Sequence, residues 1–134
     1  MADLAPVAYV DSSALIKLVV PEAESEKLRA ELERWTRHAS SAVARTEVVR
    51  AAARVDAAAP ARASRVLRAL SLIAITDEIL DRAAELEPLT LRSLDALHLA
   101  SALSLEGALG PVVTYDVRLG EAAKTAGLDV LAPS

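Results

Sequence analysis

The sequence predicts an α/β fold in which helices cover both faces of a mainly parallel sheet. Short apolar runs alternate along the chain with longer segments whose apolar residues recur at helical spacing. Of 134 residues, 53% are hydrophobic, but Phe is absent and aromatic residues make up only 2%. The core must therefore consist of Leu, Val, Ile and Ala, which suits helices packed on a sheet. We expect one domain over residues 1–134.

Five short apolar runs are expected to form the strands, and one or two helical segments separate each run from the next. The predicted strands are 7–10, 39–42, 72–75, 112–114 and 130–131. A strand–helix–strand alternation of this kind requires crossover connections, and these favour parallel pairing.

Capping residues and prolines mark the ends of several predicted helices. The first helix runs from Ser12 to the residue before Pro21, and the second starts near Glu22. A third carries Val48 and Ala52 on one face. The later helices are expected to begin at Pro60, to run from the N-cap Thr76 to Pro88, to span 90–107, and to span 116–126 with Gly127 as the terminating residue.

Composition and charge exclude several classes of protein. The chain has no cysteine and only two histidines, so disulfides and thiolate or His-rich metal sites are not expected. Its net charge of −4 argues against a broad nonspecific grip on nucleic acid, although a local basic groove stays possible. We found no signal-peptide pattern and no apolar run of membrane-spanning length, and therefore expect a cytoplasmic protein that is not bound to a membrane.

Four acidic residues occupy positions that should converge at one edge of the sheet. Asp11 and Asp116 each follow an apolar strand, and Glu47 and Asp95 each lie early in a predicted helix. In open parallel sheets, ligands bind beyond the carboxyl ends of the strands. Four carboxylates at that edge suggest a site for a hard divalent cation.

Each of these acids also has a purely structural interpretation. Asp11 and Asp116 could serve only as N-caps, and Asp95 could complement the dipole of its helix. Glu47 could form an exposed pair with Arg50 or Arg54, which are three and seven residues further along the same helix.

Four segments of the chain, in order, resemble the segments that define PIN domains, in particular the VapC-like toxins of type II toxin–antitoxin systems. They are 9–18 (YVDSSALIKL), 41–48 (SAVARTEV), 94–100 (LDALHLA) and 113–119 (VTYDVRL). The resemblance spans essentially the whole chain. It implies a three-layer α/β/α PIN-like domain whose central sheet has about five strands.

The resemblance also implies a metal-dependent endoribonuclease with an RNA substrate, a cognate VapB-like antitoxin and a homodimer. Asp11, Glu47, Asp95 and Asp116 match the acidic quartet of the family, and Thr114 matches the hydroxyl residue two positions before the last acid. Some members carry a further acid where this chain has Gly120 followed by Glu121.

The chemistry of oxygen ligands agrees with a Mg²⁺ or Mn²⁺ site. Our hypothesis makes Asp11 and Asp116 the main ligands and lets Asp95 complete the site. Glu47 would bind a second metal or position the attacking water. Ser12, Thr114 and Arg118 are expected to contact the substrate.

Other residues carry weaker expectations. Arg45 and Arg50 could line an RNA groove, and Ser13 could contact the phosphate or cap its helix. We expect His98 to be structural rather than a catalytic base, and Tyr9 and Trp35 to be packing residues. Leucines on the first two helices could contact an antitoxin or could belong to the core: Leu15, Leu18, Leu28 and Leu32.

Three rival classes fit the sequence less well. A receiver domain would carry an acid pair at the first strand and a Lys near the end, and an aspartate-nucleophile phosphatase would carry a second Asp two residues after Asp11. Neither pattern is present, since Asp11 is followed by two serines. A PIN-like protein-binding module without catalysis remains the main alternative.

Overall fold

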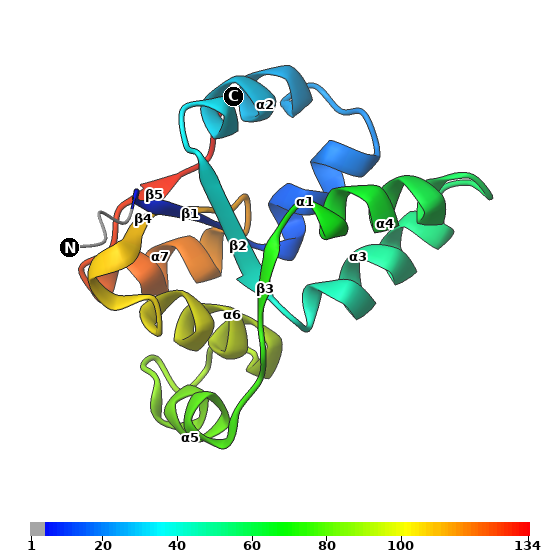
Figure 1. Cartoon of the computed structure of the whole chain (residues 1–134). Coiled ribbons are helices and arrows are strands. Elements are labelled where there is room, and N and C mark those ends of the chain that lie inside the picture. Colours follow the sequence, from blue (N-terminus) through cyan, green and yellow to red (C-terminus); the bar gives the residue numbers. More distant parts are fainter. Residues whose placement is uncertain (1–4) are drawn as a thin grey trace.

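A five-stranded parallel sheet forms the centre of the computed structural model, which describes residues 5–134 (Figure 1). The strand order is β3-β2-β1-β4-β5. The strands are β1 (Val7–Val10), β2 (Arg37–Ser41), β3 (Ser71–Ile73), β4 (Leu109–Val113) and β5 (Val130–Leu131). The predicted α/β class and number of strands are confirmed.

Within the described part of the chain, seven α-helices connect and cover these strands. They are α1 (Ser12–Val19), α2 (Ser25–Glu33), α3 (Ala44–Ala53), α4 (Ala59–Arg68), α5 (Asp77–Glu85), α6 (Ser93–Leu103) and α7 (Val117–Thr125). The Thr76 hydroxyl caps α5 by accepting the Ile79 amide proton. Gly127 follows the end of α7 at φ 87°, the left-handed conformation that glycine adopts without steric cost. Both of these predicted helix ends are confirmed.

Alternate residues of the central strands face opposite helical layers. Ala8 and Val10 of β1 and Val113 of β4 belong to a core cluster with residues of α1 to α4. Tyr9 and Val112 instead pack with Ala102 of α6. The sheet is therefore buried on both faces, as the alternation of strands and helices predicted.

Several predicted boundaries were displaced. The third strand ends at Ile73 instead of Ile75, because β3 lies at the sheet edge and pairs with β2 alone. The helix expected over 90–107 is shorter, since Arg92 is its N-cap in extended conformation and a 3₁₀ turn, Glu106–Ala108, follows its end.

The leucines of the first two helices belong mainly to the core. Leu15, Leu28 and Leu32 are buried in the cluster on the α1–α4 side, and Leu18 is half-buried against it. The proposal that these residues form an antitoxin-binding face is therefore wrong for the three buried leucines. No helix within residues 5–134 is both long and apolar enough to cross a lipid bilayer.

The packing of Trp35 against Gly110 predicts a stability effect. A Cβ atom at Gly110 would lie 2.8 Å from Cζ3 of Trp35 and 3.3 Å from the Val7 carbonyl oxygen. The indole is also held by its Nε1–H, which donates to Glu31 at 3.1 Å. We expect Gly110→Ala to destabilise the fold by about 1–3 kcal/mol, because the core on this side would be overpacked.

Chemical denaturation would measure this loss, with Gly107→Ala as the matched control. A Cβ at Gly107 would meet no atom within 4 Å. Equal stability of the two variants would show that the indole moves aside without cost.

Candidate active site

The carboxylate of Asp11 lies at the carboxyl end of the central strand β1 and is only 3% exposed. Its Oδ1 caps α1 by accepting the Ala14 amide proton at 3.0 Å, and it also accepts from the Ser13 hydroxyl at 2.7 Å. Its Oδ2 accepts from the Thr114 hydroxyl at 2.6 Å. Burial raises the pKa of Asp11, and the hydrogen bonds from Thr114 and Ser13 only partly oppose this shift.

Thr114 connects Asp11 to Asp116, the next acid. While its hydroxyl donates to Asp11, its Oγ1 accepts the Asp116 amide proton at 3.0 Å. Oδ1 of Asp116 then caps α7 by accepting from the amides of Arg118 and Leu119, at 2.9 and 3.1 Å. Both acids thus act as helix caps through one oxygen. Both acids are therefore N-caps, but not only N-caps, because Oδ2 of Asp11 accepts from Thr114 and Oδ2 of Asp116 contacts Arg92.

Glu47 of α3 joins the site through hydrogen bonds rather than through an arginine pair. Its Oε1 accepts from the Ser12 hydroxyl at 2.6 Å and from Nε2 of His98 at 2.8 Å. Burial alone would raise the pKa of Glu47, but the bonds from His98 and Ser12 outweigh it and hold the pKa below its usual value. The expected pairing of Glu47 with Arg50 or Arg54 is absent from the structure over residues 5–134.

His98 is held from behind by a second buried group. The Tyr9 hydroxyl lies 2.7 Å from Nδ1 of His98, and both side chains are almost fully buried. Burial raises the pKa of Tyr9, so its hydroxyl keeps its proton and donates to Nδ1. Nε2 must then carry the imidazole proton, which it donates to Glu47. Tyr9 is thus a packing residue, as expected, but it also fixes the orientation of His98.

Arg92 bridges the remaining acid, Asp95, to Asp116. Its Nε lies 3.3 Å from Oδ2 of Asp95, and its Nη2 lies 3.2 Å from Oδ2 of Asp116. Burial and the neighbouring Asp116 raise the pKa of Asp95, while Arg92 opposes them. The guanidinium therefore supplies the positive charge that two nearby carboxylates require.

Thr114 and Arg92 link three of the acids, Asp11, Asp116 and Asp95, but they do not form a finished metal cage. The fourth acid, Glu47, is joined to Ser12 and His98 instead. Within residues 5–134, no three Asp, Glu, His or Cys side chains are grouped closely enough to hold an ion as they stand. The donor set nevertheless fits a hard divalent cation: every acid offers oxygen, the buried Asp11 carboxylate needs a counter-charge, and Arg92 already places a cation between two acids.

The other residues predicted for the site have different placements. Ser12 is buried and its hydroxyl is committed to Glu47, and Ser13 bonds to Asp11 and to the Tyr115 amide. Thr114 is 2% exposed, with its hydroxyl used between two acids. Arg118 is exposed at the start of α7.

Sequence reasoning missed Arg92 and the Tyr9–His98 contact. Arg92 stands three residues before Asp95, and this spacing, which is typical of an ion pair on a helix, could have indicated the role of Arg92. The second joins residues 89 apart in the chain, and periodicity carries no information about such a pair.

Comparison with known proteins identifies the family. The sequence profile of the PIN domain matches residues 8–125, and the chain belongs to the PIN domain family. The chain is 48% identical over 128 residues to Ribonuclease VapC46 of Mycobacterium tuberculosis, covering 94% of this chain and 97% of the relative. It is 35% identical over 130 residues to Ribonuclease VapC47 of the same species, covering 93% and 96% of the two chains.

Solved structures share the fold. A toxin–antitoxin complex from Klebsiella pneumoniae contains a chain with a TM-score of 0.74 and 25% identity, covering 95% of this chain and 98% of that one. Mycobacterium tuberculosis VapC20, described as a toxin that cleaves the sarcin–ricin loop, aligns with a TM-score of 0.72 at 15% identity, covering 95% and 99%. The latter likeness concerns the fold alone.

The raised pKa of Asp11 predicts that Asp11→Asn increases the stability of the fold, by an amount that depends on pH. A raised pKa means that ionised Asp11 costs stability once the pH exceeds the ordinary pKa of aspartate in the unfolded chain. Neutral Asn avoids this cost. In EDTA, we expect the melting temperature of Asp11→Asn to exceed that of the wild type at pH 7, and the gain to shrink as the pH falls towards 4.

Thermal melts across this pH range, followed by circular dichroism, provide the measurement. In a domain of this size, a shift of roughly 4 °C in the melting temperature corresponds to a change of 1 kcal/mol in the free energy of unfolding. Asp129→Asn is the control, since Asp129 is exposed. A gain that stays constant or grows as the pH falls would contradict the burial argument.

Proposed function

We propose that this PIN-domain protein is a metal-dependent endoribonuclease, the toxin of a VapBC-type toxin–antitoxin pair. The observation that carries the proposal is the buried carboxylate of Asp11 at the end of the central strand, tied through Thr114 to Asp116. The relatives named Ribonuclease VapC support it, because they match this chain over nearly their whole length.

Asp11 and Asp116 would hold a Mg²⁺ or Mn²⁺ ion, with Asp95 completing the site. When bound, the ion would lower the pKa of a coordinated water and stabilise negative charge on the scissile phosphate. The cation would take over the charge-balancing role of Arg92, and the freed guanidinium would be available to the phosphate.

Glu47 would position the attacking water or bind a second metal ion. Its Oε1 is occupied by Ser12 and His98, and its lowered pKa keeps the carboxylate ionised at neutral pH. Oε2 makes no hydrogen bond within the described chain and is available to the water. His98 would therefore be a positioning residue that fixes Glu47, in agreement with the expectation that it is not the catalytic base.

The remaining predicted contacts concern the RNA substrate. Arg118 is exposed beside Asp116 and would bind an RNA phosphate. Ser12 and Thr114 were expected to touch the substrate, but their hydroxyls are engaged with Glu47 and with Asp11. We therefore propose that these two residues act on the substrate through the acids that they orient.

Cleavage of a cellular RNA pool by the purified protein tests the proposed function. In Mn²⁺ or Mg²⁺, we expect Asp11→Asn to lose about a hundredfold or more in cleavage rate, because a principal metal ligand is lost. EDTA should abolish wild-type cleavage, and Asp129→Asn should cleave as the wild type does. Absence of cleavage by folded wild type would favour a protein-binding PIN module instead.

An antitoxin is the protein partner that we propose, since one matching structure is described as a toxin–antitoxin complex. A VapB-like protein that inserted an arginine or an acid at the acidic edge would compete with metal or with Arg92. We also propose that toxin and antitoxin act in the cytoplasm.

A homodimer is the assembly that we propose, and an apolar surface near α5, α6 and α7 supports it. Leu89 is 74% exposed and Val117 is 76% exposed. Two shallow hollows meet at Leu91: one contains Leu80 and Leu89 in its wall, and the other contains Val117. A second copy of the chain would remove this surface from water.

Charge placed on this surface should disrupt the dimer. We expect Leu89→Glu to shift the protein from dimer to monomer in light scattering coupled to size-exclusion chromatography, because the buried carboxylate would lack a partner. Val55→Glu is the matched control, since Val55 is 54% exposed on another face, after α3. A wild-type protein that is monomeric at high concentration would contradict the assembly.

A further inference from the structure

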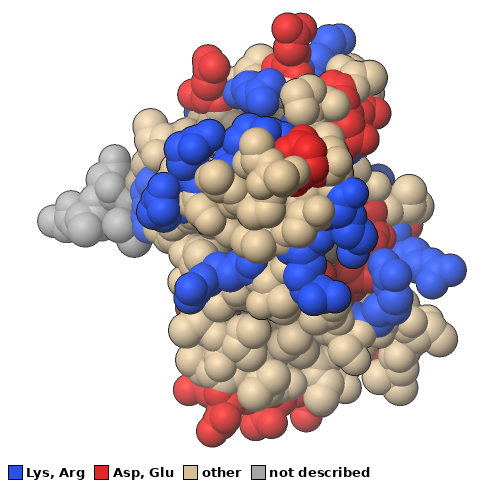
Figure 2. Space-filling model, turned by 90° about the vertical axis from the view of Figure 1, so that its right-hand side faces the viewer, with Lys and Arg blue, Asp and Glu red and all other residues tan. Residues whose placement is uncertain are grey.

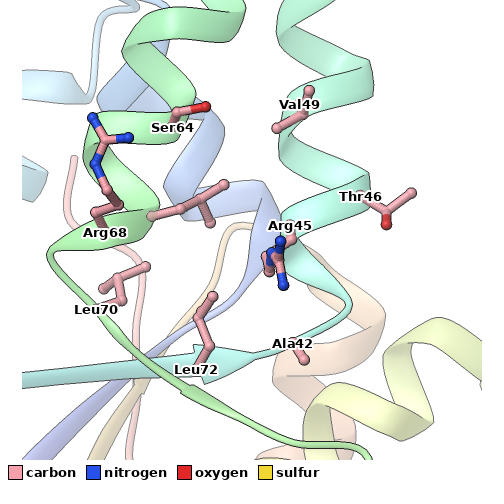
Figure 3. A pocket seen from close by; sticks show the side chains of 9 residues that line it. Ala42, Arg45, Thr46, Val49, Ser64, Arg68, Leu70 and Leu72 are labelled. Carbon is pink, nitrogen blue, oxygen red and sulfur yellow. The ribbon is translucent and has the colours of Figure 1, made fainter.

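A groove lies between α3 and α4, beside the acidic edge but distinct from it. Its volume is about 760 Å³, and its floor comes from the segment leading into β3. Figure 3 shows Arg45 and Val49 on α3, Ser64 and Arg68 on α4, and Leu72 below them. The two arginines stand on opposite sides of the space.

The segment that forms the groove, residues 42–72, has a net positive charge, whereas the chain as a whole is negative. Residues 42–72 contain six arginines and two acids, in a protein of net charge −4. Figure 2 shows basic side chains across the middle of this face and acidic side chains mainly at its upper and lower ends. The lower end belongs to the α5 segment, 76–88, which carries five acids and one arginine. An anionic partner would therefore be drawn to the α3–α4 face.

The arginines at the groove are not engaged in structural ion pairs. Arg45 and Arg68 are both exposed, and neither guanidinium contacts a carboxylate within residues 5–134. In contrast, Arg62 of the same helix as Arg68 pairs with Asp56 at 3.3 Å. Two unpaired guanidinium groups flanking a hollow are suited to bidentate contact with phosphate.

The floor between the arginines is apolar. Val49, Leu70 and Leu72 are each only partly buried there, and Leu67 lies below them. An apolar surface between two groups suited to binding phosphate can contact the face of a nucleobase, whereas a binding site for a small anion alone would be polar throughout.

Helix α3 contributes residues to both the groove and the acidic edge. Thr46 lines the groove and is followed directly by Glu47, whose carboxylate belongs to the candidate active site. An RNA strand with its scissile phosphate at the acids would pass Thr46 and enter the groove with a neighbouring nucleotide.

We propose that the groove between α3 and α4 is a subsite for single-stranded RNA, in which Arg45 and Arg68 bind backbone phosphates and the apolar floor contacts a base next to the cleaved bond. The inference rests on the proposed ribonuclease function. It makes this groove a determinant of which RNA sequence or loop is cut.

Binding of a fluorescent single-stranded RNA, measured by anisotropy, tests the subsite. The background is the full chain with Asp11→Asn, which separates binding from cleavage, and wild type in EDTA repeats each measurement. We expect the double variant Arg45→Ala/Arg68→Ala to weaken binding on the order of tenfold. The slope of log affinity against log salt should fall in magnitude by about 1.4, or about 0.7 for each lost phosphate contact.

Two further variants separate the parts of the proposal. Arg34→Ala removes an exposed arginine from the end of α2 and should change neither affinity nor slope beyond a small long-range effect. Ser64→Trp fills the groove without removing charge, so it should weaken binding while leaving the salt slope unchanged. Thermal melts verify that each variant is folded.

The possible failures are distinguishable. If wild type cleaves RNA in Mn²⁺ but the double arginine variant binds RNA as Arg34→Ala does, the subsite is overturned and the nuclease stands. If that variant instead loses affinity only for an acidic amphipathic peptide, the groove is a protein-docking surface and the proposal is likewise overturned. If wild type neither cleaves nor binds RNA, both proposals fall.

Discussion

The hydrogen bond from Thr114 to Asp11 is the contact on which the candidate site depends. It joins the ends of the neighbouring strands β1 and β4, and it fixes the Asp11 carboxylate, which is 3% exposed. The backbone supports the same junction, since the Asp11 amide donates to the Val113 carbonyl at 3.1 Å. A buried carboxylate is tolerated only when its oxygens are satisfied, and here donors from the first turn of α1 and from Thr114, just after β4, satisfy them.

The core that supports this edge contains almost no aromatic residues. Val, Leu and Ala from β1, β4 and four helices form one side of the sheet, and smaller clusters form the other. The few aromatic residues have specific positions. Tyr9 supports His98 and thereby Glu47, while Trp35 lies over Gly110 at the opposite end of β4. Residues of β1 and β4 therefore both form the core and support the side chains of the candidate site.

The sequence was sufficient to predict the order of the elements and the places of Asp11 and Asp116 at strand ends. Strand–helix alternation placed Asp11 and Asp116 at strand ends, because that placement follows from local pattern alone. The partners of the acids did not follow in the same way. Glu47 could equally have paired with Arg50, which is close in sequence, and only the folded chain brings His98 and Ser12 to it. The pair of Arg92 with Asp95 has a local signal in the sequence, but its contact with Asp116, 24 residues further along the chain, does not.

The separation of charge between the α3–α4 face and the α5 segment gives the molecule an electric dipole. When a polyanion approaches at low ionic strength, its field exerts a torque on the protein. This torque turns the basic face of the protein towards the polyanion before any atoms touch. Collisions are thereby converted into productive encounters more often than the net charge of −4 would suggest. Because the Debye length is only about 8 Å at physiological salt, this guidance acts over the last step of approach.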